Sequence, residues 1–418
     1  MDVVHPRCAG LDVHKRDVVA CRVTLDEQGR KLVQKRRFST MTPDLLALSD
    51  WLVAGGITQV AMESTGEYWR PVYNILEGAF EPSALWVVNA KHIKNVPGRK
   101  TDVKDAEWLA ELLRHGLVRA SFVPPIEQRD VRDLTRHRTN FVRERATLVN
   151  RVQKVLEGAN IKLACVATDV MGASGRAMLA AIVGGVADPA ALALLAKGRL
   201  KEKREQLEQA LTGRVRAHQR LILSELLCQI DNLDESIARL NNAIEEALRP
   251  FDPAGDLVPL LDTIPGVAGT TAQVILSEVG TDLSRFPTAG HLCAWAGVAP
   301  GNNESAGKRL SGKTRHGNRM LCSALVQAAH AAARTKDTYL AAQYRRLVGR
   351  RGKNRALIAV AHSILVIAYH VIERRQAYVE LGSDYFDRRK PEATAKRLIT
   401  RLEQLGYTVS PPQEVCAA

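Results

Sequence analysis

The first part of the chain alternates between apolar and polar residues with a period of two. Between residues 8 and 40, "CAGLDVH" is apolar around Asp12. It is followed by the alternating "RDVVACRVTL", the turn "DEQGRK" and a second alternating stretch, "LVQKRRFST". A period of two separated by turn residues is typical of β-strands. The pattern therefore predicts three successive strands.

Helical and strand patterns alternate over the following residues. We expect "TPDLLALSDWLVAGG" to be a helix capped by Thr42, and "YWRPVYNILEGA" to be a second helix. "TQVAMEST", which contains Glu63, and "SALWVVNA" are predicted to be buried strands, and a helix is predicted to begin at Asp102. Three strands followed by this alternation predict a mixed α/β sheet with helices on its faces.

The pattern changes at about residue 128. The stretches "LTRHRTNFVRERATLVNRVQKVLEGANIKL" and "LTGRVRAHQRLILSELLCQIDNLDESIARLNNAIEEALR" are long, heptad-like and rich in Arg, Glu and Leu. They favour two long helices, either an antiparallel pair or an oligomeric coiled coil. Between them, "GASGRAMLAAIVGGVADPAALALLAKG" predicts short helices in a loop.

A second globular unit, mainly helical, is predicted to open at "LLDTIPGVAGTTAQVILSEVG". It extends to an apolar stretch, residues 356–372, that is interrupted by His362 and His370 and is short for a membrane span, so we expect a buried helix. The start of the chain lacks a signal-peptide pattern. The expected organisation is 1–127, an α/β domain; 128–250, a helical coiled-coil region; 255–375, a mainly α domain; and 376–418, a frayed tail.

Charge and cysteine usage narrow the function. The 418 residues include 59 Lys and Arg against 45 Asp and Glu, a net charge of +14. Such an excess favours a polyanionic partner, most often nucleic acid, although simple solubility is the alternative. The 7 cysteines are odd in number and form no Cys-x-x-Cys pair. They favour reduced thiols in a cytoplasm and argue against a disulfide framework or a zinc knuckle.

Four acidic residues stand at positions where chemistry is expected. Asp102 and Asp105, in "KTDVKDAEW", suit the first turn of an ordinary helix, where negative charge is stabilised. Asp12 lies inside an apolar strand, where an unpaired carboxylate is costly, and Glu63 ends another strand. A carboxylate on the first strand, one at the end of the fourth and two on a late helix is the arrangement of RNase H-like nucleases. This order favours a site for two divalent cations, Mg²⁺ or Mn²⁺.

Several segments resemble one known family. "GLDVHK", "MESTGEYWRPV" and "GRKTDVKDAEWLAELLRHG" resemble the RuvC-like DEDD domain of bacterial insertion-sequence transposases of the one-hundred-and-ten family, relatives of the Piv DNA invertase. "IPGVAGTTAQVILSEVG", "AWAGVAPGNNESAGK" and "RHGNRMLCSALVQAA" resemble the C-terminal transposase domain of the same family. The resemblance places the four DEDD acids at Asp12, Glu63, Asp102 and Asp105.

The segment "PGNNESAGKRLSGKTRHGNR" is dense in Gly, Asn, Ser and cations. It suits either a solvated loop or a loop that faces phosphate. The resemblance implies a covalent serine–DNA intermediate formed by Ser305, in a Ser-x-Gly-Lys element, whereas Ser311 is the alternative serine. The acids and the serine then lie on different domains, so the active site must assemble between them, either within one chain or between subunits. The cations of the segment are Lys308, Arg309, Lys313, Arg315 and Arg319.

Two further stretches are candidates for contact with nucleic acid. Gly266 and Gly269 suit the turn of a helix-hairpin-helix, whose helix amides bind phosphate, although a plain interhelical turn fits as well. "RRLVGRRGKNR", which includes Arg350 and Arg351, has no acidic residue. It suits a contact with the nucleic-acid backbone, or a solvated face.

The leading hypothesis is a DNA recombinase that cuts, exchanges and rejoins strands of a mobile element in the bacterial cytoplasm, close to the nucleoid. The resemblance further implies donor and target DNA, an element-encoded guide RNA and a tetramer built from dimers, with no membrane. One rival is a Holliday-junction or other structure-specific nuclease, which would use water and need no Ser305. The other is a non-enzymatic coiled-coil protein that binds nucleic acid, which has no reason to place four acids against its ligand.

Overall fold

The computed structural model describes residues 2–64, 66–89, 105–301, 303–389 and 391–409. The chain divides into two compact units, Met1–Pro124 and Pro125–Ala418. Each unit has its own architecture and its own hydrophobic cores.

The N-terminal unit is a six-stranded mixed sheet with helices, as predicted. The three leading strands form, and the order is β3-β2-β1-β4-β5-β6, with β4 parallel to both β1 and β5. This is the RNase H-like arrangement. Thr42 was expected to cap the first helix, but the extended backbone of Met41 makes Met41 the cap. The elements are β1 (Cys8–Val13), β2 (Asp17–Leu25), β3 (Lys31–Ser39), α1 (Thr42–Ala54), β4 (Gln59–Glu63), α2 (Trp69–Leu76), a 3₁₀ turn (Pro82–Ala84), β5 (Leu85–Val88), α4 (Asp105–Arg114) and β6 (Ala120–Ser121).

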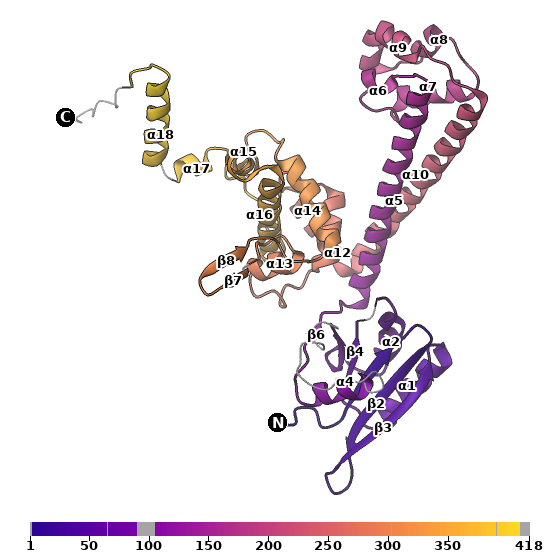
Figure 1. Cartoon of the computed structure of the whole chain (residues 1–418), viewed down its shortest axis with the longest axis vertical. Coiled ribbons are helices and arrows are strands. Elements are labelled where there is room, and N and C mark those ends of the chain that lie inside the picture. Colours follow the sequence, from indigo (N-terminus) through magenta and orange to yellow (C-terminus); the bar gives the residue numbers. More distant parts are fainter. Residues whose placement is uncertain (1, 65, 90–104, 302, 390, 410–418) are drawn as a thin grey trace, which may run out of the picture. The chain divides into compact units, whose positions relative to one another are not determined.

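Side chains alternate between the two faces of this sheet, and each face has its own helices (Figure 1). Leu11 and Met62 point to the face covered by α1 and α2. Cys8 and Ala61 point to the opposite face, where they pack with Leu109 and other apolar residues of α4. The sheet is therefore the middle of three layers.

Two long helices open the second unit, α5 (Ile126–Gly158) and α10 (Ala217–Phe251). They lie side by side and run antiparallel (Figure 1), since Val131 packs with Leu248 whereas Val152 packs with Leu227. The two predicted long helices are confirmed, and they form an antiparallel pair within one chain. The oligomeric coiled coil is not shown.

The segment between these helices is a packed helical cluster rather than short helices in a loop. Its residues share one core with the facing ends of α5 and α10, including Leu156, Leu179, Leu207 and Leu223. The short helices are held together by apolar contacts. The periodicity of each helix taken separately does not predict that they share one core. Its elements are α6 (Leu163–Val166), α7 (Ala173–Val183), α8 (Pro189–Ala193), a 3₁₀ segment (Gly198–Lys203) and α9 (Arg204–Leu211).

The C-terminal part is mainly helical, and α16 runs through its core. By length and composition α16 is apolar enough to cross a membrane, but its residues Val360, Ile364 and Leu365 pack inside the domain, which confirms the expected buried helix. The tail was expected to be frayed, but its described residues form two helices, of 4 and 14 residues. The elements are α11 (Leu257–Asp262), α12 (Gly269–Val279), α13 (Ala289–Ala296), β7 (Asn303–Ser305), β8 (Lys308–Ser311), α14 (Arg319–Ala332), α15 (Tyr339–Arg351), α16 (Lys353–Arg374), α17 (Tyr385–Arg388) and α18 (Pro391–Gln404).

Gly10 allows α4 to lie against the sheet. A Cβ on Gly10 would lie 2.2 Å from the carbonyl oxygen of Ala106 and 2.5 Å from the amide nitrogen of Ala110. Both atoms are helix backbone, so they cannot rotate away. We predict that Gly10→Ala lowers the free energy of unfolding of the N-terminal unit by about 1–3 kcal/mol, the usual cost of overpacking.

Urea unfolding followed by tryptophan fluorescence measures this, because four tryptophans, at positions 51, 69, 86 and 108, lie in the N-terminal unit. Gly349→Ala is the matched control. Its added Cβ would meet no heavy atom within 4 Å, so the change should be neutral or slightly stabilising. A Gly10→Ala protein as stable as the wild type would contradict the close packing of α4.

Candidate active site

Two of the predicted acids lie side by side at one end of the sheet. In the parallel pair of β1 and β4, Leu11 is the register partner of Met62. One further step along both strands brings Asp12 beside Glu63. Because side chains alternate, both carboxylates point to the face that α4 covers. A Cβ built on Gly10 would point to the same face.

A third acid reaches the same end because α4 runs antiparallel to β1. The end of α4 lies near the start of β1, where the carbonyl of Arg114 accepts from the N–H groups of Val4 and His5 at 2.9 and 3.0 Å. One helix turn earlier, the carbonyl of Ala110 accepts from the Cys8 thiol at 3.4 Å. The first turn of α4, with Asp105, therefore lies at the end of β1 that carries Asp12.

This carboxylate group has the donor chemistry of a hard-cation site. The Asp12 side chain is 20% exposed, and its Oδ2 lies 3.0 Å from Nε2 of His14. Asp105 lies in the first turn of α4, where the helix dipole stabilises negative charge. Asp102 lies outside the described residues. Among the residues that are described, no group of three or more His, Cys, Asp or Glu is close enough to hold a metal ion. Carboxylate oxygens are nevertheless the ligands that Mg²⁺ and Mn²⁺ prefer.

The predicted nucleophile lies next to the tip of a β-hairpin in the other unit. β7 and β8 pair antiparallel, with Ser305 opposite Lys308. The two residues between them, Ala306 and Gly307, have φ angles of +49° and +74°. Two positive φ angles are the signature of the tight hairpin turn that matches the twist of the strands. Ser305 is thus the last strand residue before the turn.

The base of this hairpin is held by close backbone contacts. The N–H of Gly301 donates to the carbonyl of Lys313 at 3.2 Å. A Cβ on Gly317 would lie 2.3 Å from the amide nitrogen of Gly297. Ser311 lies on β8 nearer to this base, and its Oγ accepts from the N–H of Lys313 at 3.1 Å. The two candidate serines therefore differ in position, with Ser305 at the tip.

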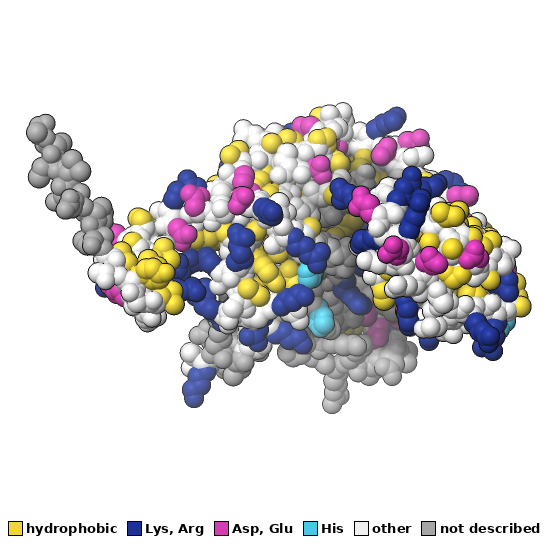
Figure 2. All heavy atoms as spheres, turned by 90° about the horizontal axis from the view of Figure 1, so that it is seen from above, with side chains coloured by type: hydrophobic (Ala, Val, Ile, Leu, Met, Phe, Trp, Pro, Cys, Tyr) yellow, Lys and Arg dark blue, Asp and Glu magenta, His cyan; other side chains and the backbone are white. Residues whose placement is uncertain are grey.

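The predicted cations form an exposed set around the hairpin and on α15. Lys308, Lys313, Arg315 and Arg319 are exposed, and β8 places Arg309 opposite Glu304. Arg350 and Arg351 are exposed in the last turn of α15, before Gly352 turns the chain into α16. Among the described residues, none of these six exposed cations forms an ion pair. Figure 2 shows Lys and Arg side chains spread over the visible surface.

The predicted helix-hairpin-helix glycines have different surroundings. Gly266, in the turn between α11 and α12, has a φ of +87°, and its Cβ would lie 2.3 Å from the carbonyl oxygen of Ala328 in α14. This contact accounts for Gly266 without any ligand. Gly269 opens α12, and a Cβ there would meet no heavy atom within 4 Å.

Glu278, a buried carboxylate, was not identified from the sequence as a candidate structural or functional residue. Glu278 of α12 is buried, and its carboxylate accepts from Arg136 of α5 and from Asn318. A carboxylate in the apolar stretch "QVILSEVG" was the available signal. Its partners lie far away in the sequence, so the pattern alone did not identify them.

Comparison with known proteins agrees with this arrangement. Residues 9–161 match the family model for the DEDD transposase domain, described as transposase, and residues 258–345 match the model described as transposase of the IS116/IS110/IS902 family. The transposase for insertion sequence element IS1111A of Coxiella burnetii is 27% identical over 326 residues, which cover 76% of this chain and 79% of that protein. A probable family 20 transposase of Pseudomonas aeruginosa is 26% identical over 376 residues, 88% of this chain and 94% of that protein.

Both matched regions contain the elements described above. The first spans the sheet, α4 and all of α5, and the second spans α12, the serine hairpin and α14. The DEDD domain implies a metal-dependent acidic site, which fits the three carboxylates at one end of the sheet. The chain belongs to the IS110/IS116/IS902 family of transposases, enzymes that transfer phosphoryl groups in DNA.

Proposed function

We propose that this transposase cuts, exchanges and rejoins DNA strands through a covalent bond between Ser305 and DNA. The observation that carries the proposal is the position of Ser305 beside a tight hairpin tip, flanked by exposed cations. A residue at such a tip can reach a bound phosphodiester. The neighbouring Lys308, Lys313 and Arg315 would bind the phosphate and the negative charge that develops on it.

The proposed step conserves the phosphodiester. The Ser305 hydroxyl gives up its proton, its oxygen forms a bond to phosphorus, and one phosphorus–oxygen bond to a sugar breaks. The sugar leaves as a free hydroxyl after gaining a proton. Attack on the serine phosphodiester by a sugar hydroxyl of another strand restores the serine and joins the strands. Rejoining therefore needs no external energy source. Such a covalent intermediate suits a recombinase, whereas a hydrolase that uses water does not need it.

We also propose that Asp12, Glu63, Asp102 and Asp105 bind Mg²⁺ or Mn²⁺. When bound, these ions would supply Lewis-acid activation and charge stabilisation. Support comes from the shared position of Asp12, Glu63 and Asp105 at one end of the sheet. The acids and Ser305 belong to different units, so the proposal assigns the metal chemistry to one unit and the nucleophile to the other.

Nucleic-acid binding is assigned to the exposed cations and to the start of α12. Arg319 and Arg309 extend the set around the hairpin, and Arg350 and Arg351 add a second basic segment. Gly269 would allow a phosphate to approach the first amides of α12. Gly266 supports the turn. Guidance by an element-encoded RNA is part of the proposal and rests on the family resemblance and the net charge of +14.

The metal proposal predicts a loss of ion binding when an acid is changed. Mn²⁺ should raise the free energy of unfolding of the wild type by mass action, by about 2.7 kcal/mol at a hundred times the dissociation constant, and so raise its melting temperature. Asp12→Asn and Asp105→Asn should weaken this shift. Asp44→Asn is the matched control, because Asp44 lies in the first turn of α1 on the other side of the sheet. Asp102→Asn should abolish strand cleavage and keep the fold, and full metal-dependent cleavage by that variant would contradict the proposal.

The serine proposal predicts the fate of one covalent product. Wild-type protein with Mg²⁺, donor and target DNA, and RNA transcribed from the flank of the gene should give a denaturant-resistant protein–DNA adduct. Ser305→Ala should bind DNA normally and form neither the adduct nor recombinant product, whereas Ser311→Ala should form the adduct. The reverse result would make Ser311 the nucleophile. Cleavage by the wild type without any adduct would favour a nuclease that uses water.

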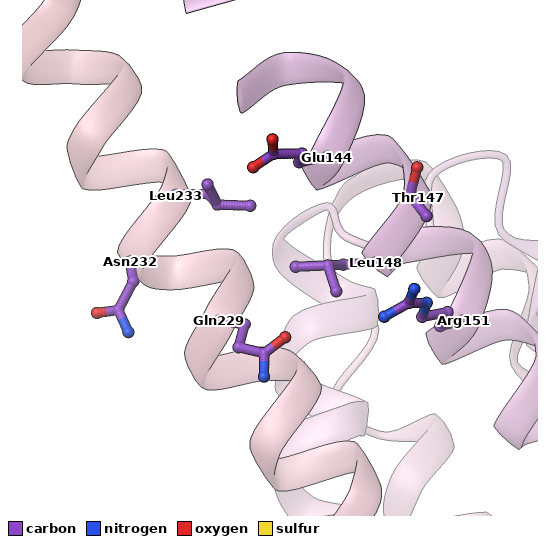
Figure 3. A pocket seen from close by; sticks show the side chains of 7 residues that line it. All are labelled: Glu144, Thr147, Leu148, Arg151, Gln229, Asn232 and Leu233. Carbon is purple, nitrogen blue, oxygen red and sulfur yellow. The ribbon is translucent and has the colours of Figure 1, made fainter. Parts of the chain in front are cut away.

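Self-association through the helix pair is proposed as well, up to a tetramer built from dimers. A groove of about 400 Å³ lies between α5 and α10, and Leu148 and Leu233 point into the space between the helices (Figure 3). Val142 and Leu221 are exposed apolar residues on the same helices. Light scattering should detect an oligomer at micromolar concentration. A strict monomer, with and without nucleic acid, would contradict this assembly.

A further inference from the structure

Glu278 is a buried carboxylate inside the C-terminal part of the chain. Its side chain has no exposed surface, so the negative charge depends on protein partners. Arg136 supplies two parallel hydrogen bonds, from Nε to Oε1 at 2.7 Å and from Nη2 to Oε2 at 2.9 Å. Arg132 lies one turn earlier on α5, with its Nε 3.3 Å from Oε2. Glu278 therefore ties α12 to α5.

The same carboxylate also reaches the base of the serine hairpin. Nδ2 of Asn318 donates to Oε2 of Glu278 at 2.6 Å. The Oδ1 atom of Asn318 caps α14 by accepting from the N–H groups of Met320 and Leu321, each at 3.1 Å. The main-chain N–H of Asn318 donates to the carbonyl of Trp295 in α13 at 3.4 Å. Asn318 therefore joins Glu278, the start of α14 and the end of α13.

Asn318 stands where the chain returns from the hairpin. The preceding residue, Gly317, lies in close backbone contact with Gly297, which ends α13 with a φ of +78°. The hairpin that carries Ser305 leaves and re-enters the domain at this contact. Glu278 holds the returning segment through Asn318, so its carboxylate fixes the hairpin base relative to α12 and α5.

Further hydrogen bonds hold α12 on α5, on the side of Glu278 away from the hairpin. Nε2 of Gln128 donates to the carbonyl of Ser277 at 3.0 Å, and Oγ1 of Thr135 lies 2.9 Å from Oγ of Ser277. Nη2 of Arg132 donates to the carbonyl of Glu278 at 2.9 Å. These bonds join α12 to the first turns of α5. This helix begins at Ile126, next to the start of the second unit at Pro125.

We propose that Glu278 is a positioning residue, which holds the base of the Ser305 hairpin in a fixed orientation on α5 through Asn318 and Arg136. Nonpolar packing would also hold these helices, and buried ion pairs often add little net stability compared with apolar side chains. Paired, directional hydrogen bonds set an orientation that apolar contacts leave loose. The inference rests on the proposed function, since it concerns where Ser305 is presented.

The test compares Glu278→Gln with the wild type in the full-length protein. Glutamine keeps the shape of glutamate, but its NH₂ group is a donor. It would face the N–H donors of Arg136, Arg132 or Asn318, so at least one hydrogen bond is lost. Hydrogen exchange of the amides in residues 313–321 should become at least about tenfold faster. Formation of the serine–DNA adduct at saturating DNA should slow by about tenfold, with the DNA concentration for half-maximal rate changed by less than about twofold. Arg136→Lys, which keeps the charge and loses the fork, should show the same pattern.

Two controls separate positioning from general stability. Asp234→Asn breaks the exposed pair between Arg145 of α5 and Asp234 of α10, and it should leave both readings unchanged. Ile244→Ala removes apolar packing between α5 and α10 and should lower the melting temperature without slowing the adduct selectively. Unchanged exchange at 313–321 in Glu278→Gln would overturn the proposal. The proposal would also be overturned if Glu278→Gln slowed adduct formation no more than Ile244→Ala does, when the two variants lose the same stability.

Failure of the proposed function has a different signature. If the wild type forms no adduct, Ser305 is not a nucleophile. The hydrogen-exchange comparison then still decides whether Glu278 holds the hairpin base.

Discussion

The buried charge network between α5 and α12 is the constraint on which the C-terminal architecture depends. Moving the Glu278 carboxylate and the Arg132 guanidinium group out of water is costly, and burial lowers the pKa of Arg132 to about 10 despite the opposing effect of Glu278. The cost is offset only when every partner is in place. Glu278, Arg132 and Arg136 therefore restrict α5 and α12 to one mutual arrangement, because any other would leave a buried charge unpaired.

Close backbone approach is a second constraint, and glycine allows it at several described positions, three of which join elements named above. Gly10 admits α4 to the sheet, Gly266 admits the turn before α12 to α14, and Gly317 meets Gly297 below the hairpin. At each joint an added Cβ would lie within 3.0 Å of backbone atoms, which cannot rotate aside. Two of the joints serve the candidate sites directly. One brings the start of α4 to the acid end of β1, and the other closes the base of the Ser305 hairpin.

The residues of the proposed chemistry lie in two units that differ in construction. The acids lie on strand ends and a helix start, which are rigid positions set by sheet register and by packing of α4. The serine lies at a hairpin tip, outside the hydrophobic core of its domain. A metal site needs several ligands converging on one point, which a sheet supplies. A nucleophile that must reach a phosphodiester benefits from a projecting turn.

The sequence by itself determined the local elements and the kinds of chemistry. Alternation predicted the three leading strands, and heptad spacing predicted the two long helices. The order of Asp12, Glu63, Asp102 and Asp105 predicted a shared place for four acids, three of which lie within the described residues. These features depend on neighbouring residues, or on the fixed topology of a parallel strand pair, so they can be read along the chain.

Only the tertiary structure decided which distant residues meet. It paired α5 with α10 inside one chain, gave Gly266 a contact with α14, and made Met41 rather than Thr42 the cap of α1. It also joined Glu278 to Arg136, which is 142 residues away. A heptad pattern specifies an apolar stripe but not its partner, and a lone buried acid specifies a need for cations but not their position. Those choices depend on packing over the whole domain, which no local pattern contains.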